Sequence, residues 1–539
     1  MGLGYSRRRE SSSALRTRNV DQPAGSATTG ETLQFVSLFG YRTIEESLVE
    51  LKRLLFDSLP ALLFTALGFL VMGYHPGLED DGVYLTAVKA DLNPALYPHN
   101  SGFFRLQTQA TLFDTWMAHF VRLTGMSVAW AELFWHLASL FFILWASNRI
   151  AKRIFAEKPA QWAAVAMVSA MLTLPVAGTA LNIADQHLHP RNLATALILL
   201  AVSRILDGKR LHAVFLLLVA FLLHPIMAAL GLSFCLFLGL AVSQPVPRRV
   251  RPRARVLVAA APLGWMFEPA NPAWKQALDT RGYYFLYQWQ WYEWLGALAP
   301  LFLFWLLWRL ARKHGETRLA QLAFAIFAYG TFHQLVAIAI LTPQSLARLT
   351  PLQPMRYLQL IYVFLALIAG GLLGRFLLQA KVWRWAVYLL VINSSMFAVQ
   401  SEFIDEGAHL ELPWTETANP WLQAFNWVRA NTPVDAYFAL DPHYLAAPGE
   451  GYRSFRALAE RSQLSDAVKD PAVATQVPSL APEWQRQQLA QKGWPDFRLG
   501  DFERLKSTFG VNWVVVSRPS PGGLDCLWHN ATLSVCRIP

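Results

Sequence analysis

The chain has 539 residues, of which 54% are hydrophobic and only 15% are Asp, Glu, Lys or Arg. Soluble globular proteins contain about 25% of these charged residues, so the composition excludes an ordinary soluble protein and indicates one embedded in a membrane. The net charge is +11 at pH 7. In a membrane protein such a balance signals orientation across the bilayer, and nucleic acid is not an expected partner.

Residues 1–53 have the composition of a tail. Arginines at positions 7, 8, 9, 16 and 18 stand among Ser, Thr and Gly, and no long apolar segment adjoins them. This pattern does not fit a secretory signal peptide. It favours a disordered cytoplasmic tail.

Apolar runs that are long enough to cross a bilayer recur between residues 54 and 400. A spanning helix needs about 20 apolar residues, and somewhat fewer where it is sheltered inside a bundle. The runs at 211–224 and 256–267 are short and fit half-spanning segments. We predict an α-helical polytopic membrane domain at 54–400 with about 11 transmembrane helices. The runs lie at residues 54–73, 129–148, 161–180, 192–207, 211–224, 226–243, 256–267, 294–309, 319–341, 355–375 and 384–400.

The Lys and Arg residues between these runs predict the topology, because cytoplasmic loops of membrane proteins are enriched in both. If the N-terminus is inside and the spans alternate, every inward loop is short and basic, whereas the outward loops are longer and hold only scattered cations. The rule places the first long loop, 74–128, and residues 401–539 outside. The inward loops hold Arg149, Lys152, Arg153, Lys158, Arg204, Lys209, Arg210, Arg248 to Arg255, Arg309, Arg312, Lys313, Arg318, Arg375, Lys381 and Arg384.

Three consecutive carboxylates, Glu79, Asp80 and Asp81, follow directly on the first apolar run. Acidic side chains near hydrocarbon are costly, so at a helix end they are either solvated or kept for function. A solvated helix exit is one interpretation. The clustering of the three acids favours function, as does the aromatic, amphipathic segment from Val83 to Phe120.

The loop before the run at 192–207 contains Asp185, His187, His189 and Arg191. Alternate residues of an extended segment share one face, so the Asp and the two His could ligate a divalent ion. A polar interfacial loop without a metal is the alternative. His224 precedes Pro225, which interrupts an apolar stretch; a structural histidine and a ligand-binding one are both open there.

Residues 268–294 form an aromatic loop that includes Trp289, Trp291 and Tyr292. These rings could stack on a sugar, or they could form a belt at the bilayer interface. Arg356 stands at the outer start of a long apolar run, with Arg348 just before it. Arg grips phosphate through paired hydrogen bonds, and snorkelling to lipid headgroups is the alternative.

Residues 401–539 have the composition of a soluble domain, with helical signals at 421–429 and strand signals at 436–440 and 511–517. We predict a small α/β domain, extracytoplasmic because it follows an odd number of spans. Cys526 and Cys536 are expected to pair there if that space is oxidising.

This pattern resembles the GT-C family of integral-membrane glycosyltransferases. Members have the N-terminus inside, an acidic motif and amphipathic helices in the first outward loop, and often a soluble domain after the last helix. The resemblance rests on Glu79-Asp80-Asp81, Phe103 to Arg122, Asp185 to Arg191 and Arg356. The stretches Trp427 to Ala436, Phe455 to Arg461 and Lys469-Asp470 resemble an uncharacterised domain that follows such membrane halves in bacterial proteins.

The resemblance implies a bacterial cell-membrane enzyme that takes a sugar from a polyprenyl-phosphate-linked donor and gives it to a glycan, lipid or protein acceptor. An outward carboxylate would act as the base on the acceptor. We rank Asp80 first, with Glu79 or Asp81 orienting it or assisting a metal. Three acids stand where a pair is more usual, so the identity of the base is open, as is the need for a divalent metal ion.

The chemistry of such a transfer points the same way. It needs a carboxylate to take the acceptor proton and cations to stabilise the departing phosphate. Candidates for the phosphate are Arg356, Arg191, Arg348 and His224. No P-loop or dinucleotide fingerprint precedes a predicted helix, so a nucleotide donor is not indicated. A transporter or lipid flippase, or a non-catalytic assembly subunit with the same fold, are the alternatives.

Overall fold

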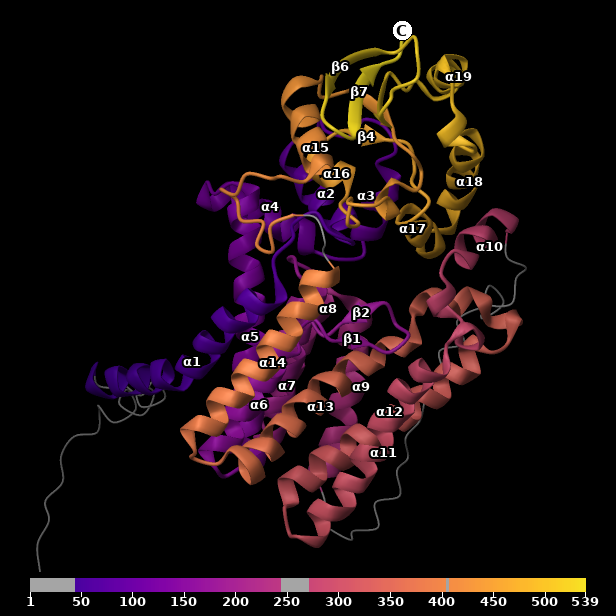
Figure 1. Cartoon of the computed structure of the whole chain (residues 1–539). Coiled ribbons are helices and arrows are strands. Elements are labelled where there is room, and N and C mark those ends of the chain that lie inside the picture. Colours follow the sequence, from indigo (N-terminus) through magenta and orange to yellow (C-terminus); the bar gives the residue numbers. More distant parts are fainter. Residues whose placement is uncertain (1–43, 244–270, 404–406) are drawn as a thin grey trace, which may run out of the picture. The chain divides into compact units, whose positions relative to one another are not determined.

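The computed structural model describes residues 44–243, 271–403 and 407–539, except for the side chains of 44–57, 344 and 403 (Figure 1). The predicted run at 256–267, the basic loop at 248–255 and most of the predicted tail therefore lie outside the described residues. The chain divides into two compact units, Met1–Asp57 and Ser58–Pro539, and the features below belong to the second.

Apolar helices dominate the chain up to Phe403. Six helical segments in the described ranges are long and apolar enough to cross a membrane, which supports the predicted helical membrane protein. Two more apolar helices are shorter. Each predicted run outside 256–267 coincides at least partly with a helix, although the total number of crossings stays a prediction. The helices that coincide with the predicted runs are α1 (Ile44–Met72), α5 (Val128–Ile154), α6 (Lys158–Ala170), α7 (Pro190–Leu206), α8 (Arg210–Leu223), α9 (Pro225–Val242), α11 (Trp291–Lys313), α12 (Thr317–Leu341), α13 (Leu358–Leu373) and α14 (Val382–Phe403).

The predicted run at 161–180 is helical only in its first part. α6 ends at Ala170, and the strands β1 (Pro175–Val176) and β2 (Leu181–Asn182) follow as an antiparallel hairpin. Proline disfavours a helical residue before it, which fits the break. Gly178, between the strands, has a φ of +59°, and a Cβ there would lie 2.5 Å from the ring of Trp289. The hairpin therefore requires glycine at this point.

α13 packs closely against α6. A Cβ on Gly370 would lie 2.4 Å from the carbonyl oxygen of Ala163, and one on Gly374 would lie 2.4 Å from the carbonyl oxygen of Pro159. Small residues spaced four apart allow the backbones of two membrane helices to approach in this way. The contact fixes α13, whose N-terminal end leads from the loop that carries Arg356.

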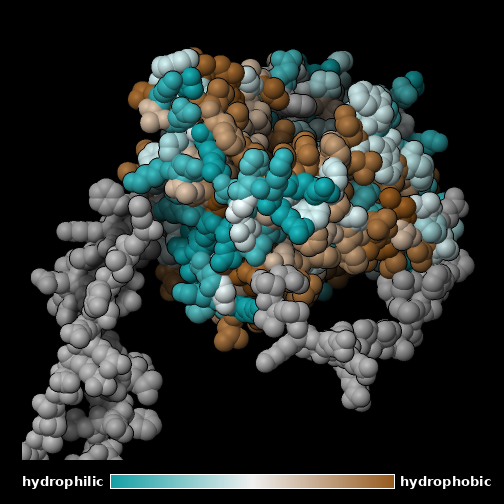
Figure 2. Space-filling model, turned by 90° about the horizontal axis from the view of Figure 1, so that it is seen from below, coloured by the Kyte–Doolittle hydropathy of each residue, from teal (hydrophilic) through white to brown (hydrophobic). Residues whose placement is uncertain are grey.

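Three predicted inward connections meet at one end of the helices. Arg375, just after α13, pairs with Glu157 between α5 and α6 at 3.0 Å and with Glu316 between α11 and α12 at 2.7 Å. Figure 2 views the molecule from below and shows hydrophilic side chains gathered beside larger hydrophobic areas. These contacts agree with the predicted alternation of loops, while the side of the membrane that this end faces stays a prediction.

The first predicted outward loop is largely helical. It contains α2 (Asp81–Leu92), α3 (Gly102–Thr108) and α4 (Phe113–Thr124), so the amphipathic segment predicted at 103–122 is helical. Apolar side chains of α2 and α4 pack together with the start of α5. The packing holds the N-terminal end of α2, where the acid cluster lies.

The C-terminal region contains a five-stranded mixed sheet. β3 pairs in parallel with β4 and β5, whereas β7 pairs antiparallel with β5 and β6. The helix and two strands predicted from the sequence correspond to α15 (Pro420–Asn431), β3 and β5, so the predicted α/β pattern is confirmed. The strand order is β4 (Ser462–Gln463), β3 (Tyr437–Ala439), β5 (Trp513–Ser517), β7 (Leu533–Arg537) and β6 (Asp525–His529).

Helices cover both faces of this sheet. Successive side chains of a strand point to opposite faces. Trp513 and Val515 of β5 accordingly pack on the side of α15, and Val514 and Val516 on the side of α19 (Leu499–Phe509). The central strand β5 is thus buried on both sides, as its unbroken apolar run implies.

Cys526 and Cys536 form a disulfide between paired positions of β6 and β7. Their expected pairing is therefore confirmed.

The C-terminal region packs directly on the first outward loop (Figure 1). Tyr74, after α1, forms a β-bridge with Leu410. Lys89 of α2 donates a hydrogen bond of 2.7 Å to the carbonyl oxygen of Ala457 in α16 (Phe455–Ala459). Residues that follow the last apolar helix therefore help to position the acid cluster.

Candidate functional site

A cavity of about 570 Å³ lies where the first outward loop, the helix connections at the same end and C-terminal residues meet. Its walls come from segments that are far apart in the sequence, and they bring carboxylates and cations together. Its charged and titratable lining residues are Glu79, Asp80, Tyr84, His189, His224, Arg281, Tyr283, Tyr284, Arg356, Tyr452 and Lys469.

Asp80 reaches this cavity from the turn between α1 and α2. Its Oδ2 lies 3.3 Å from Nε2 of His189, its Oδ1 lies 3.4 Å from Nζ of Lys469, and its side chain is 39% exposed. Burial opposes ionisation of Asp80, but Lys469, His189 and Arg191 outweigh this effect and hold the pKa of the carboxyl well below its usual range. Asp80 is thus an ionised, accessible carboxylate at neutral pH.

Asp81 faces away from the cavity. Its side chain is buried, and its Oδ2 accepts a hydrogen bond of 2.8 Å from the backbone N–H of Gly77. Burial and the neighbouring carboxyl of Glu132 raise the pKa of Asp81 well above its ordinary value. Asp81 is therefore a buried acid that stabilises the turn. The sequence left it open as a residue of the site, but it does not line the cavity.

Glu79 lines the cavity beside Asp80 and forms an ion pair with Lys469. Its backbone has a φ of +52°, in the left-handed region that is unfavourable for a residue with a Cβ. This conformation ends the turn so that Glu79 and Asp80 point to one side and Asp81 to the other. The structure thereby separates three acids that stand side by side in the sequence.

His189 is the contact between the acid cluster and the 185–191 loop. Its Nδ1 accepts a hydrogen bond of 2.9 Å from the backbone N–H of Arg191. Burial and Arg191 lower the pKa of His189, although Asp185 and Asp80 act in the opposite direction. A neutral ring that accepts at Nδ1 carries its proton on Nε2, so His189 donates to Asp80.

Asp185 and Arg191 form a buried ion pair behind His189, with Nε of Arg191 3.2 Å from Oδ2 of Asp185. Burial opposes ionisation of Asp185, yet Arg191, His189 and His187 lower its pKa to about 2. Burial lowers the pKa of the His187 imidazole to about 3. The 185–191 loop therefore reaches the acid cluster, with His189 as the residue in contact.

The loop does not fit a metal site. No group of three or more His, Cys, Asp or Glu side chains that could hold a metal ion occurs in the described parts of the chain, which include Asp185, His187 and His189. The carboxylate of Asp185 is occupied by the guanidinium of Arg191, and a cation there opposes a second one. Arg191 is not among the residues that line the cavity, and its contact with a donor phosphate stays a prediction.

Arg356 lines the cavity from the short 3₁₀ turn before α13. Its Nε donates a hydrogen bond to Oε1 of Gln353, and Nε2 of Gln353 donates one of 2.7 Å to the hydroxyl of Tyr284. Gln353 has a φ of +49°, a strained backbone that these contacts hold. The arginine is therefore fixed at the cavity wall, which a side chain snorkelling to lipid headgroups would not require.

The other predicted phosphate ligands divide between two cavities. His224 lines the same cavity as Arg356, and its ring centre lies 6.1 Å from that of His189. Arg348 lines a separate cavity of about 390 Å³ together with Trp274. His224 and Arg348 were predicted to lie at one site because they share one side of the membrane. Sharing a side does not determine where along that side each residue lies.

The aromatic residues at the cavity are not the ones predicted. Trp291 and Tyr292 begin α11 with 75% and 58% of their surface exposed, as an interfacial belt would have them. Trp289 is buried, and its Nε1 donates a hydrogen bond of 3.1 Å to the carbonyl oxygen of Tyr283. Tyr283 and Tyr284 of the same loop line the cavity instead.

Lys469 and Arg281 are the cavity cations that the sequence analysis missed as site residues. Lys469 lies 389 positions after Asp80 in the chain. Arg281 donates a hydrogen bond to the carbonyl oxygen of Val468, which ties the aromatic loop to the turn that carries Lys469. Lys469-Asp470 enters the resemblance only as part of the C-terminal region, and no local pattern in the sequence links it to the acid cluster.

No protein-family model matches the chain, and no curated protein matches it significantly.

Proposed function

We propose that the protein is a membrane glycosyltransferase of the GT-C type, which transfers a sugar from a polyprenyl-phosphate-linked donor to an acceptor hydroxyl. The observation that supports this best is the shared cavity, where the ionised Asp80 carboxylate and the Arg356 guanidinium line one space of about 570 Å³. A base for the acceptor and a cation for the phosphate are the two groups that this reaction needs.

In the proposed reaction the acceptor oxygen forms a bond to the anomeric carbon, and the bond from that carbon to the phosphate oxygen breaks. The hydroxyl proton passes to Asp80, and the polyprenyl phosphate leaves with the bonding electron pair. His189 donates to the Asp80 oxygen on the other side and keeps the carboxylate in place. Arg356, with His224 beside the same space, stabilises the phosphate as its charge grows.

The proposed orientation places the N-terminus in the cytoplasm and the cavity and residues 401–539 outside the bacterial cell membrane. The basic connections at the opposite end of the helices support it, since they fit the cytoplasmic side. The disulfide between Cys526 and Cys536 supports it as well, because such bonds persist in oxidising spaces. The acceptor, a glycan, lipid or protein, would approach from this side.

The test is turnover of polyprenyl-phosphate-linked hexoses and pentoses, radiolabelled in the sugar, by the purified full chain in lipid vesicles. Asp80→Asn should lower turnover by about 100-fold or more with donor binding nearly unchanged, because only the proton acceptor is lost. Arg356→Ala should mainly raise the Michaelis constant for the donor, since a partly desolvated phosphate loses its partner.

Asp435→Asn, at an exposed turn of the C-terminal region, is the matched control and should leave turnover unchanged. If no labelled donor is consumed, or if Asp80→Asn keeps near-normal turnover, the glycosyltransferase proposal is wrong. In that case transport of a lipid by the same helices becomes the interpretation to test.

A further inference from the structure

Lys469 brings a positive charge from the C-terminal region into the acid cluster. Its ammonium forms an ion pair with Glu79 and lies 3.4 Å from Oδ1 of Asp80. The Lys469 side chain is only 17% exposed, whereas both acids remain open to the cavity. Glu79 and Asp80 together outweigh the effect of burial and raise the pKa of Lys469, so the lysine is charged.

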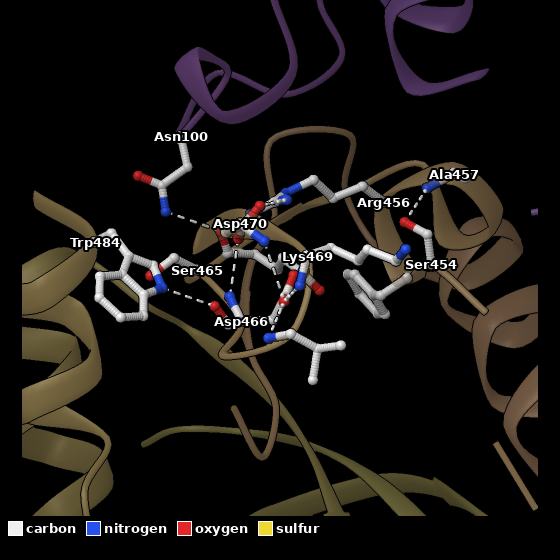
Figure 3. Close-up of polar contacts among 12 residues, drawn as sticks. Asn100, Ser454, Arg456, Ala457, Ser465, Asp466, Lys469, Asp470 and Trp484 are labelled. Carbon is white, nitrogen blue, oxygen red and sulfur yellow. Dashed lines mark hydrogen bonds and ion pairs between the residues drawn. The ribbon is translucent and has the colours of Figure 1, made fainter. Parts of the chain in front are cut away.

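The turn that carries Lys469 is held by a buried polar network (Figure 3). Oδ1 of Asp466 accepts hydrogen bonds from the backbone N–H groups of Val468, Lys469 and Asp470. The carbonyl oxygen of Asp466 accepts a further bond of 3.0 Å from the indole of Trp484. The backbone of Lys469 is therefore fixed on both sides of the turn.

A buried, bidentate ion pair between Arg456 and Asp470 anchors the same turn to α16. The two Nη atoms of Arg456 each lie 2.7 Å from a carboxylate oxygen of Asp470, and both residues are buried. Oδ2 of Asp470 also accepts the backbone N–H of Asp466 at 2.8 Å. A buried ion pair is weak evidence for stability, because its desolvation offsets much of the attraction, and it is better explained as fixing a geometry.

This network fixes the backbone from which the Lys469 side chain extends to Glu79 and Asp80. α16, which holds Arg456, packs on α2, whose first residue follows Asp80. The lysine and the carboxylate are thus presented by two rigid elements in mutual contact. A flexible surface lysine would need no such support.

We infer that Lys469 is a positioning residue of the proposed catalytic centre, and that it holds the Asp80 carboxylate in its place at the cavity wall. The inference rests on the proposed function, in which Asp80 is the base. It means that the C-terminal region completes the catalytic cavity and is part of the enzyme's active unit.

The effect of Lys469 on Asp80 can be measured through the pKa of the Asp80 carboxyl. A base works only above its own pKa, so removing a neighbouring cation raises that pKa and moves the acid limb of the pH–rate profile to higher pH. One close opposite charge shifts a carboxyl pKa by about 1–3 units. The other charged or titratable groups that act on or around Asp80 are Glu79, Tyr84, His187, His189, Arg191 and Arg356.

The experiment compares the pH dependence of kcat/KM for the full chain and for Lys469→Met, with the labelled polyprenyl-phosphate sugar that the wild type consumes. The acid limb of Lys469→Met should lie about 1–3 pH units higher than that of the wild type. Lys469→Arg keeps the charge and should restore the wild-type limb. Lys492→Met, an exposed lysine at the end of α18 (Ala481–Ala490), is the matched control and should not move it.

A second measurement does not depend on turnover or on the stability of a variant. A water-soluble carbodiimide should join Lys469 to Glu79 in the wild-type protein in vesicles, because the ammonium and carboxylate are in contact. Mass spectrometry should detect this cross-link, and Lys469→Arg should abolish it. Absence of the cross-link in the wild type would overturn the geometry on which the inference stands.

The two proposals can fail separately. If Asp80→Asn is inactive while Lys469→Met keeps the wild-type acid limb, the positioning role is wrong and the glycosyltransferase proposal stands. If Asp80→Asn is active, the function itself is wrong, whatever the behaviour of Lys469→Met.

Discussion

Two adjacent carboxylates at the start of α2 behave in opposite ways. Asp80 faces an open cavity with Lys469 and His189 at hydrogen-bond distance, and the pKa of its carboxyl is held well below the usual range. Asp81 is buried on the other side beside Glu132, and its pKa is raised. One is a charged group that can accept a proton, and the other is a buried acid that holds a turn.

The difference teaches that the number of acids in a motif says little about how many take part in chemistry. The turn from His75 to Asp81 decides which carboxylate meets which surroundings, since Gly77 and Glu79 both adopt positive φ values. Cations then stabilise the charged form of one acid, while burial disfavours the charged form of its neighbour. The three predictions below test this division.

The largest expected effect separates the two carboxylates in turnover. Asp80→Asn should lose about 100-fold or more, whereas Asp81→Asn should stay within about 3-fold of the wild type, because Asp81 does not line the cavity and an amide oxygen can still accept from Gly77. Parallel assays of the two variants under identical donor concentrations check this. Equal losses in both would mean that the acids act as one unit.

The second effect concerns stability against pH. Because the folded-state pKa of Asp81 is raised, the folded protein keeps a proton that the unfolded chain releases, so stability is present at low pH and declines as pH rises toward the folded pKa. Asp81→Asn cannot ionise and should remove this decline, a difference of about 1.4 kcal/mol for each unit of the shift. Thermal unfolding midpoints in detergent between pH 4 and 8 measure it, at steps of about one unit. A wild type and variant with parallel pH curves would contradict the raised pKa of Asp81.

The smallest effect is expected at Glu79. Glu79→Gln removes one of two carboxylates that share Lys469, so the ammonium is left to Asp80 and the pKa of Asp80 should stay low or fall further. Turnover should remain within about 3-fold, less than 1 kcal/mol, with the acid limb unmoved or shifted to lower pH. A loss of about 100-fold or more, as expected for removal of the base, would assign the base to Glu79 instead.

The sequence predicted the end of the molecule at which the site lies. Alternation of basic and acidic loops grouped Asp80, the 185–191 loop, His224 and Arg356 on one side, and all of these segments contribute to or support the cavity. The C-terminal helix and strands were predictable for a similar reason, because their hydrophobic periods are local properties.

Contacts across long stretches of chain could not be predicted in this way. Lys469 reaches Asp80 only because α16 packs on α2, and no spacing in the sequence encodes that contact. Tyr284 lines the cavity and Trp291 does not, and this difference depends on the path of the aromatic loop before α11. The end of α6 at Ala170 depends on the β1–β2 hairpin that follows. The hairpin could not be predicted because its residues continue the apolar run of the helix.

The contribution of the C-terminal region has a consequence for synthesis. A ribosome delivers Asp80, His189 and Arg356 in that order, and all of them precede the turn that carries Lys469. Helices already inserted in the bilayer must therefore wait for the last quarter of the polypeptide before the cavity has all its walls. A nascent or truncated chain that lacks this turn therefore also lacks one wall of the cavity.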